Sequence, residues 1–259
     1  CSSDLLSLRV AEGEIVALMG SNGAGKTTLA RLLCALDRPS AGSITVAGLP
    51  VSSSKHGKRP RALTRKERAA LRRNVGYVMQ HPERQLFADT VAEDVAYGPR
   101  NQHLSELEVA TRVEEALRML HIEHLADRSP FNLSGGQQRL VAIAGVIACR
   151  PRVLIMDEPT ASLDESEASR IHALLGSLKS QGVAVLIITH SIDEAEHCAD
   201  RIITMGSHNG DGEGDGCGTG DDGDTSVGDA TESSTNAGKA GIESIEDESR
   251  NRPSFVASL

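Results

Sequence analysis

The sequence predicts an α/β fold with a parallel sheet that helices cover on both faces. Short apolar runs alternate with amphipathic helical segments over the first 205 residues, as they do in β-α-β units. The runs are continuously apolar, which is typical of strands buried on both sides. The chain of 259 residues has no Trp, two Tyr and three Phe, so Leu, Ile, Val and Ala must form the core. This length suits one large domain or a domain with appendages.

Each element follows from its local pattern. Residues 15–19 form an apolar run that ends in glycine, and a helix over about 26–36 follows it. Further strands are expected at 43–46, 75–79, 153–156, 183–189 and 202–205, with a helix at about 166–180. Residues 52–73 form a polar insert with nine Lys/Arg and one Glu. We expect this basic insert to be a solvated surface loop, and the alternative is a contact with anionic lipid headgroups.

A helical insertion is expected at about 82–135. Segments 90–97 and 105–120 have apolar residues at helical spacing. Ser105 and Glu108 fit a capping box, in which the hydroxyl meets a free N–H group and the carboxylate reaches back. Ser134 is expected to cap a further helix that ends near Cys149.

The acidity of the chain belongs to its C-terminal part. The chain has 36 acidic and 27 basic residues, and 206–259 holds 12 of the acidic and 3 of the basic ones. Residues 1–205 therefore hold 24 of each and have no net charge. From Gly206 on, Gly, Asp, Ser and Thr dominate, and such a segment cannot offset its ordering entropy by burying apolar surface. We expect 1–206 to form the folded domain and 207–259 a disordered acidic tail, with at most a short amphipathic piece near 242–248. The alternative is a tail that binds a partner or a metal through Asp and His208.

Bulk features exclude several classes of protein. The five Cys lack a C-x-x-C pair, which argues against zinc and disulfides and fits a reducing cytosol. The longest apolar run, 140–149, is shorter than the ~20 residues that a spanning helix needs. No signal-peptide pattern precedes the first expected strand. A link to a membrane is therefore expected to come through a partner.

A phosphate-binding loop follows the first expected strand. The pattern G-x-x-x-x-G-K-T, followed by a helix, predicts a nucleotide site. Glycines let backbone N–H groups wrap a phosphate, and the helix directs its positive end at the same anion. A glycine-rich turn without a ligand is the alternative, which the flanking strand and helix make unfavourable. The nucleotide-binding residues are Gly20, Ser21, Asn22, Gly23, Ala24, Gly25, Lys26, Thr27 and Thr28.

Polar residues end three other expected strands. Asp157 and Glu158 follow the run 153–156, His190 follows 183–189, and Gln80 follows 75–79. Ligands of parallel sheets bind at the carboxyl ends of strands. Asp157 is expected to hold Mg²⁺, and Glu158 is the natural general base for an attacking water. Taken alone, the carboxylates would be turn caps, and His190 and Gln80 ordinary structural or surface residues.

One run resembles the signature motif of ATP-binding cassette (ABC) ATPases. It consists of Leu133, Ser134, Gly135, Gly136 and Gln137, and about twenty residues later the chain reads Leu-Ile-Met-Asp-Glu. At a helix N-terminus these residues offer a hydroxyl, close backbone approach and a positive dipole end. The resemblance covers about 10–206, with six motifs in order. It also identifies Ser162, Leu163 and Asp164 as the family's D-loop, which crosses a dimer interface.

The resemblance implies a composite site and a fold. ATP would be held by the phosphate loop of one subunit and closed by the signature residues of the other. Mg²⁺ would be bound through Thr27, Asp157 and Gln80, the last being the family's Q-loop residue. His190 would be the switch histidine, which contacts the γ-phosphate and orients the water. The fold would add a small antiparallel β subdomain and the helical subdomain to the parallel core.

A second stretch resembles the ATPases of energy-coupling factor (ECF) transporters and their cobalt and nickel relatives. These carry a glutamine-aromatic pair after the Q-loop, then the pattern V-x-x-D-V-A-(aromatic)-G-P-x-N. The resemblance implies a transmembrane coupling protein, a membrane protein that captures a vitamin or transition-metal ion, and a peripheral location on the cytoplasmic face of the membrane. The matching residues are Gln85, Phe87, Asp94, Tyr97, Gly98, Pro99 and Asn101.

The chain departs from the family pattern in three places. Residues 1–12 hold no aromatic residue for stacking on adenine, so either the start is truncated or binding rests on the phosphates. The basic insert is longer than usual, and the acidic tail stands where the family has a dimerisation region.

Three alternatives remain open: the ATPase of an ordinary ABC importer, a soluble ABC ATPase acting on DNA or ribosomes, and a non-catalytic regulatory subunit. The zero net charge of residues 1–205 and the lack of a long coiled-coil insertion argue against an ATPase that acts on DNA or ribosomes.

Overall fold

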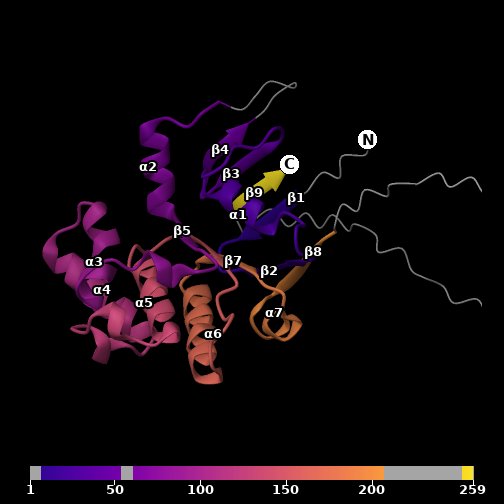
Figure 1. Cartoon of the computed structure of the whole chain (residues 1–259). Helices are drawn as coiled ribbons and strands as arrows, with labels where there is room; N and C mark the ends of the chain where they lie inside the picture. Colours follow the sequence, from indigo (N-terminus) through magenta and orange to yellow (C-terminus); the bar gives the residue numbers. More distant parts are fainter. Residues whose placement is uncertain (1–6, 54–60, 207–252, 259) are drawn as a thin grey trace, which may run out of the picture. The chain divides into compact units, whose positions relative to one another are not determined.

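A parallel sheet of five strands organises the described residues, which are 7–53, 61–206 and 253–258 of the computed structural model (Figure 1). All neighbouring strands in it run parallel, as the sequence predicts. The strand order β5-β6-β7-β2-β8 puts the phosphate loop, after β2, between the ends of β7 and β8. The strands are β2 (Ile15–Gly20), β5 (Val75–Val78), β6 (Val153–Asp157), β7 (Ala184–Ile188) and β8 (Arg201–Met205).

Both faces of this sheet are buried, which explains the continuous apolar runs. Along β6, Leu154 and Met156 belong to one core cluster, whereas Val153 and Ile155 belong to another. This is the alternation expected from the two-residue period of a strand. The first cluster packs against the helices α3, α4, α5 and α6, and the second packs against α1 and a second sheet. These helices are α1 (Lys26–Leu33), α3 (Val91–Asn101), α4 (Glu106–Met119), α5 (Gly135–Ile147) and α6 (Glu165–Ser180).

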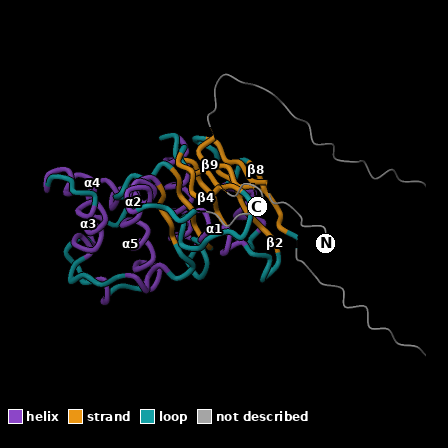
Figure 2. The backbone as a smooth tube through the Cα atoms, turned by 90° about the horizontal axis from the view of Figure 1, so that it is seen from above, coloured by secondary structure: helices purple, strands orange, loops and turns teal. Residues whose placement is uncertain are grey.

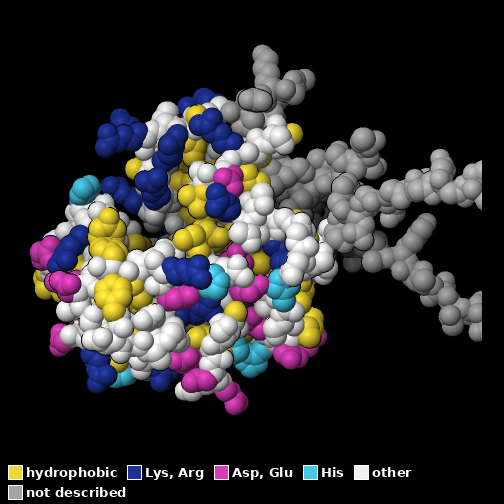
Figure 3. Space-filling view, viewed as in Figure 1, with side chains coloured by type: hydrophobic (Ala, Val, Ile, Leu, Met, Phe, Trp, Pro, Cys, Tyr) yellow, Lys and Arg dark blue, Asp and Glu magenta, His cyan; other side chains and the backbone are white. Residues whose placement is uncertain are grey.

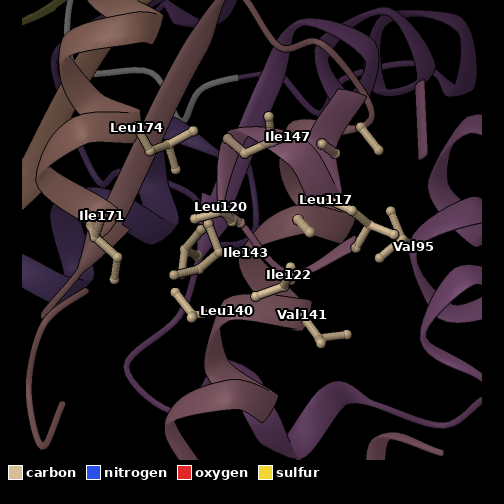
Figure 4. Packing of buried hydrophobic residues seen from close by; sticks show 14 of the residues in the cluster. Val95, Leu117, Leu120, Ile122, Leu140, Val141, Ile143, Ile147, Ile171 and Leu174 are labelled. Carbon is tan, nitrogen blue, oxygen red and sulfur yellow. The ribbon is translucent and has the colours of Figure 1, made fainter. Parts of the chain in front are cut away.

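The helical insertion is present where it was expected. α3, α4 and α5 pack against one another and lie together on one side of the strands (Figure 2). Figure 4 shows how Val95 of α3, Leu117 of α4 and Val141 of α5 fill their shared core. Ser105 caps α4, as its Oγ accepts a hydrogen bond from Glu108 N at 3.3 Å. The other half of the predicted capping box does not form, because the Glu108 carboxylate pairs with Arg112 at 2.7 Å instead of reaching back to the N-cap.

Short 3₁₀ turns and one further helix complete the elements between the strands. They are η1 (Pro82–Gln85), η2 (Glu123–Leu125), η3 (Pro130–Asn132) and α7 (Ile192–Cys198). Among the helices of the described ranges, none is long and apolar enough to cross a membrane.

The antiparallel sheet contradicts part of the prediction of a disordered tail. Its order is β1-β9-β3-β4, and its second strand comes from the segment assigned to the disordered 207–259. Phe255 and Ala257 are buried between β1 and β3, whereas Val256 is 37% exposed. This alternation makes 253–258 a strand although the residues before it are polar. The strands are β1 (Ser7–Ala11), β3 (Ser43–Val46), β4 (Leu49–Ser53) and β9 (Pro253–Ser258).

The remaining expectations for the tail, including His208 and 242–248, lie outside the described residues, as do residues 1–6 of the start.

The basic insert contains a helix that the sequence analysis missed. α2 (Arg65–Asn74) begins at Thr64, whose side chain and that of Glu67 form a capping box. Leu71 packs into the core, and Lys and Arg side chains gather over α2 on the face shown in Figure 3. The expectation of a surface loop over 52–73 is therefore wrong for 65–73, which lie in α2, and for 52–53, which end β4, and 54–60 lies outside the described residues.

Candidate functional site

Backbone conformation shapes the phosphate loop between β2 and α1. Gly23 and Gly25 have φ of +82° and +92°, a region that favours glycine. Gly25 is the N-cap of α1, and a glycine leaves the first N–H groups of the helix free of a side-chain cap. Lys26 is buried, and its Nζ donates hydrogen bonds to the carbonyl oxygens of Gly20 at 2.7 Å and Ser21 at 3.0 Å. The loop thus presents N–H groups and one cation around a common centre.

The first residue of the loop, Gly20, lies in close contact with Met205 of β8. Gly20 ends β2 with φ of +147°, and a Cβ at this position would lie 2.5 Å from the carbonyl oxygen of Met205. A side chain would therefore displace either the loop or β8. Glycine at this position is required by the close approach of the two strands as well as by the phosphate pattern.

The carboxyl end of β6 meets the first turn of α1. Asp157 Oδ2 accepts a hydrogen bond from Thr27 Oγ1 at 2.9 Å. Burial raises the pKa of Asp157, while the Thr27 hydrogen bond and the nearby Lys26 act in the opposite direction. The hydroxyl and the carboxylate form an oxygen donor set of the kind that Mg²⁺ prefers.

Glu158 lies between the two other predicted residues. Its Oε1 is 3.0 Å from His190 Nε2, and its Oε2 is 3.5 Å from Gln80 Nε2. Its φ of +52° is uncommon for a residue with a side chain. A hydrogen bond from Glu158 N to Ile188 O at 2.8 Å ties this backbone to the end of β7.

A hollow of about 400 Å³ joins these groups. The structure therefore brings together the residues that the sequence analysis predicted from four strand ends. Its lining consists of Asn22, Gly23, Ala24, Gly25, Lys26, Thr27, Thr28, Gln80, Asp157, Glu158 and His190.

The predicted signature residues lie at the start of α5. Ser134 is the N-cap, and its Oγ accepts from Gln137 N at 3.2 Å while Gln137 Oε1 accepts from Ser134 N at 3.2 Å. A methyl group at Gly135 would meet no described atom within 4 Å, whereas one at Gly136 would overlap the Glu167 carboxylate. Gly135 is therefore open to an approaching group.

A second hollow, of about 590 Å³, adjoins the signature glycines. The predicted D-loop residues Ser162 and Leu163 line it, and it shares Gln80 and Glu158 with the first hollow. Asp164 caps α6, since its Oδ1 accepts from Glu167 N at 2.7 Å. The D-loop thus leads from Glu158 to the start of α6.

Arg139 is a connecting residue that the sequence analysis missed. This arginine of α5 is 5% exposed and donates to the carbonyl oxygens of Ala161 and, at 2.5 Å, Gln80. It links the signature helix to the D-loop and to the residue that contacts Glu158. The one signal in the sequence is a charged residue beside the apolar run 140–149.

Glu194 of α7 is a second missed residue. It is 7% exposed and accepts hydrogen bonds from the hydroxyls of Thr160 at 2.7 Å and Thr189 at 2.5 Å. The pattern Ser191-x-x-Glu194 predicts a helix start, but it gives no sign of these long-range contacts.

Comparison with known families identifies the cassette. The family model described as "ABC transporter" matches residues 4–161. The chain belongs to this family. The match confirms the predicted family, and the ABC ATPase cassette has the parallel sheet, antiparallel sheet and helical insertion described above.

Curated relatives narrow the resemblance. A putative ABC transporter ATP-binding protein of Bifidobacterium longum is 69% identical over 205 residues, which are 78% of this chain and 26% of that protein. An energy-coupling factor transporter ATP-binding protein of Symbiobacterium thermophilum is 43% identical over 78% of this chain and 67% of its own length. A cobalt import ATP-binding protein of Rhodobacter capsulatus is 45% identical over 77% of this chain and 68% of its own length. The chain thus spans about a quarter of the first relative and about two thirds of the others.

Solved structures agree with these relatives. CbiO1 from Clostridium perfringens, part of the ABC transporter complex CbiONQ, aligns with a TM-score of 0.65 and 39% identity over 75% of this chain and 74% of its own. The ATP-binding cassette MJ0796, in a dimeric post-hydrolysis state bound to ADP and phosphate, aligns with a TM-score of 0.66 and 31% identity over 76% and 83% of the two chains.

Proposed function

We propose that this chain hydrolyses ATP as one of two cassettes that power a membrane importer of the ECF type. The observation that carries the proposal is the contact of Glu158 with His190 beside the phosphate loop. The contact supports the proposal, because the carboxylate and the imidazole both line the hollow that the phosphate loop also lines.

ATP binding would rest on the backbone of the loop. The N–H groups around Gly23 and Gly25 and the positive end of α1 would hold the β-phosphate, and Lys26 would exchange its carbonyl partners for phosphate oxygens. Thr27, Asp157 and Gln80 would hold Mg²⁺, which neutralises charge on the phosphates when bound.

Hydrolysis would use Glu158 as the general base. A water beside its carboxylate gives up a proton to Glu158 as its oxygen attacks the γ-phosphorus, and the bond from that phosphorus to the bridging oxygen of ADP breaks. His190, 3.0 Å from Glu158, would orient the carboxylate and the water.

A second cassette would complete the site. Ser134, Gly135 and Gly136 would contact the γ-phosphate held by the opposite subunit, and Ser162, Leu163 and Asp164 would cross the interface. The openness around Gly135 and the dimeric state named for the MJ0796 structure support this arrangement.

The importer type rests on the relatives. Several are named ECF transporter or cobalt import ATP-binding proteins, and the pattern that ends in Asn101 fits the same group. The partners would be a transmembrane coupling protein and a membrane protein that captures a vitamin or metal ion. The chain would then lie peripherally on the cytoplasmic face of the membrane.

The general base is tested by Glu158→Gln. Hydrolysis of MgATP by the full chain is expected to fall by about 10²–10⁴-fold, the usual contribution of a positioned base, while ATP binding persists. Glu165→Gln, at an exposed carboxylate in the first turn of α6, is the matched control and should hydrolyse ATP normally. An unchanged rate in Glu158→Gln contradicts the assignment.

The importer type is tested by purification from native membranes. A transmembrane protein and a small membrane capture protein are expected to co-purify with the chain. Recovery of a permease pair with a separate binding protein would instead support an ordinary ABC importer.

A further inference from the structure

The contacts of Glu194 involve residues that are close in the chain to the proposed catalytic pair, Glu158 and His190. Thr160 lies two residues after Glu158 in the chain, and Thr189 is the residue before His190. Because both hydroxyls donate to one buried carboxylate, Glu194 joins the two segments that carry the pair.

This is a second attachment between those segments. The first is the parallel pairing of β6 with β7, which ends with the hydrogen bond from Glu158 N to Ile188 O at 2.8 Å. The residues that follow both strands lie beyond this pairing, and the contacts of Glu194 with Thr160 and Thr189 fix their relative orientation. The attachment through Thr160 also supports the left-handed conformation of Glu158, φ +52°, which has an energetic cost and persists only when its surroundings enforce it.

The orientation of Glu194 is itself fixed. It lies in the first turn of α7, where the helix dipole favours a carboxylate. Ser191 Oγ accepts a hydrogen bond from Glu194 N at 3.2 Å, and Thr189 Oγ1 accepts from Ser191 N at 3.1 Å. The Thr189 hydroxyl therefore accepts from the backbone and donates to Glu194, which leaves its direction no freedom.

We propose that Glu194 is a positioning residue, which sets the geometry of Glu158 and His190 through Thr160 and Thr189. The inference rests on the proposed function, because it assigns Glu194 a role in the same hydrolysis. Glu194 itself does not line the phosphate-loop hollow.

The hydrogen bonds that the Glu194 carboxylate accepts predict that Glu194→Gln is a milder change than Glu194→Ala. A carboxylate accepts from both hydroxyls at once, whereas an amide offers one oxygen and a donor NH₂ group. Glu194→Gln therefore keeps one attachment, whereas Glu194→Ala loses both and leaves the buried Thr189 hydroxyl and the half-buried Thr160 hydroxyl without their acceptor.

The test is a double-mutant cycle between Glu194→Ala and His190→Ala, with steady-state MgATP hydrolysis by the full chain as the readout. Glu194→Ala alone is expected to lower kcat by about 100-fold, the size of effect that follows from misplacing reacting groups by about 1 Å, while the KM for ATP stays within about 2-fold. In the His190→Ala background the same change should lower the rate by less than about 3-fold, because coupled residues are not additive.

Two further variants separate positioning from folding. Glu194→Gln should fold and show an intermediate loss of about 5–10-fold, which corresponds to one hydrogen bond of about 1 kcal/mol. Glu196→Ala changes an exposed carboxylate of the same helix and should leave hydrolysis unchanged. If Glu194→Ala does not fold, the same cycle is run with Glu194→Gln.

The outcomes distinguish the two proposals. Full multiplication of the losses in the double variant, or wild-type kcat in Glu194→Gln and Glu194→Ala, overturns the positioning role and leaves the ATPase intact. Absence of hydrolysis in the wild-type chain, or hydrolysis that survives Glu158→Gln, overturns the proposed function itself.

Discussion

Two helix starts in this chain are proposed to meet phosphate, and they are built differently. α1 begins at Gly25, which has no side chain to cap it, and α5 begins at Ser134, which forms a reciprocal capping box with Gln137. The first start has left-handed glycines and a buried lysine beside it. In the second, the capping box satisfies the N–H groups of Ser134 and Gln137.

The difference shows how one chain can carry two unequal half-sites. Free N–H groups at α1 need an acceptor, and a loop-bound phosphate would provide it within the same chain. The start of α5 is stabilised by its own cap and needs no bound phosphate, so it can remain folded until another subunit brings one. The hydroxyl of Ser134 would then serve both as the cap and as a donor to the incoming anion.

The largest effect is expected on ATP affinity, from a substitution in the α1 half-site. Lys26→Ala removes the one cation whose ammonium group is held by the loop carbonyls. Because charge-assisted hydrogen bonds contribute about 1.5–3 kcal/mol each, ATP affinity should fall by about 100-fold or more, measured by titration calorimetry. Lys66→Ala on the exposed surface of α2 is the control, and unchanged ATP affinity in Lys26→Ala would contradict the loop assignment.

A smaller effect is expected at the α5 half-site. Ser134→Ala should cost about 1 kcal/mol of unfolding free energy through loss of the cap and lower hydrolysis by about 10-fold or more, since a donor to developing charge is lost. ATP affinity of the single chain should stay unchanged.

Ser105→Ala is the matched control for this prediction, because Ser105 Oγ accepts from Glu108 N at the start of α4, as Ser134 Oγ accepts from Gln137 N at the start of α5. It should show the same loss of stability in denaturant titrations without the loss of hydrolysis. Equal hydrolysis in the two variants would mean that Ser134 is a cap and nothing more.

The smallest effect concerns stability on the α1 side. Burial raises the pKa of Asp157 in the folded chain, so its charged form is less favourable there than in the unfolded chain and lowers stability at pH 7. Asp157→Asn should therefore raise the thermal midpoint at pH 7, and the gain should shrink as the pH falls toward the range in which an aspartate is protonated. A midpoint that falls in this variant would contradict the sign.

The parts predicted correctly from the sequence are those that local pattern determines. The run 153–156 predicts a buried strand because both its faces contact apolar residues, and the phosphate loop is recognised from consecutive residues. α2 was missed although its capping pair, Thr64 and Glu67, is local, because the density of Lys and Arg around it suggested a loop.

The other misses depend on contacts that are distant in sequence. β9 is a strand because Leu8 and Ile44 flank Ala257, and neither neighbour is visible from the residues around 257. The same holds for Glu194, whose partner Thr160 lies 34 positions earlier. Gln80, Glu158 and His190 lie together, as expected from the convergence of the ends of parallel strands, and their roles in hydrolysis remain predictions.

The position of β9 between β1 and β3 also imposes an order on folding during synthesis. The ribosome adds about 5–20 residues per second, so tens of seconds separate the appearance of Val10 from that of its partner Phe255. The strands of the parallel sheet can pair with one another once β8 has been made, whereas β1 and one edge of β3 present unpaired backbone and apolar side chains until β9 follows. Such edges invite pairing with other chains, which makes the antiparallel sheet the part of the nascent protein with the greatest need of protection.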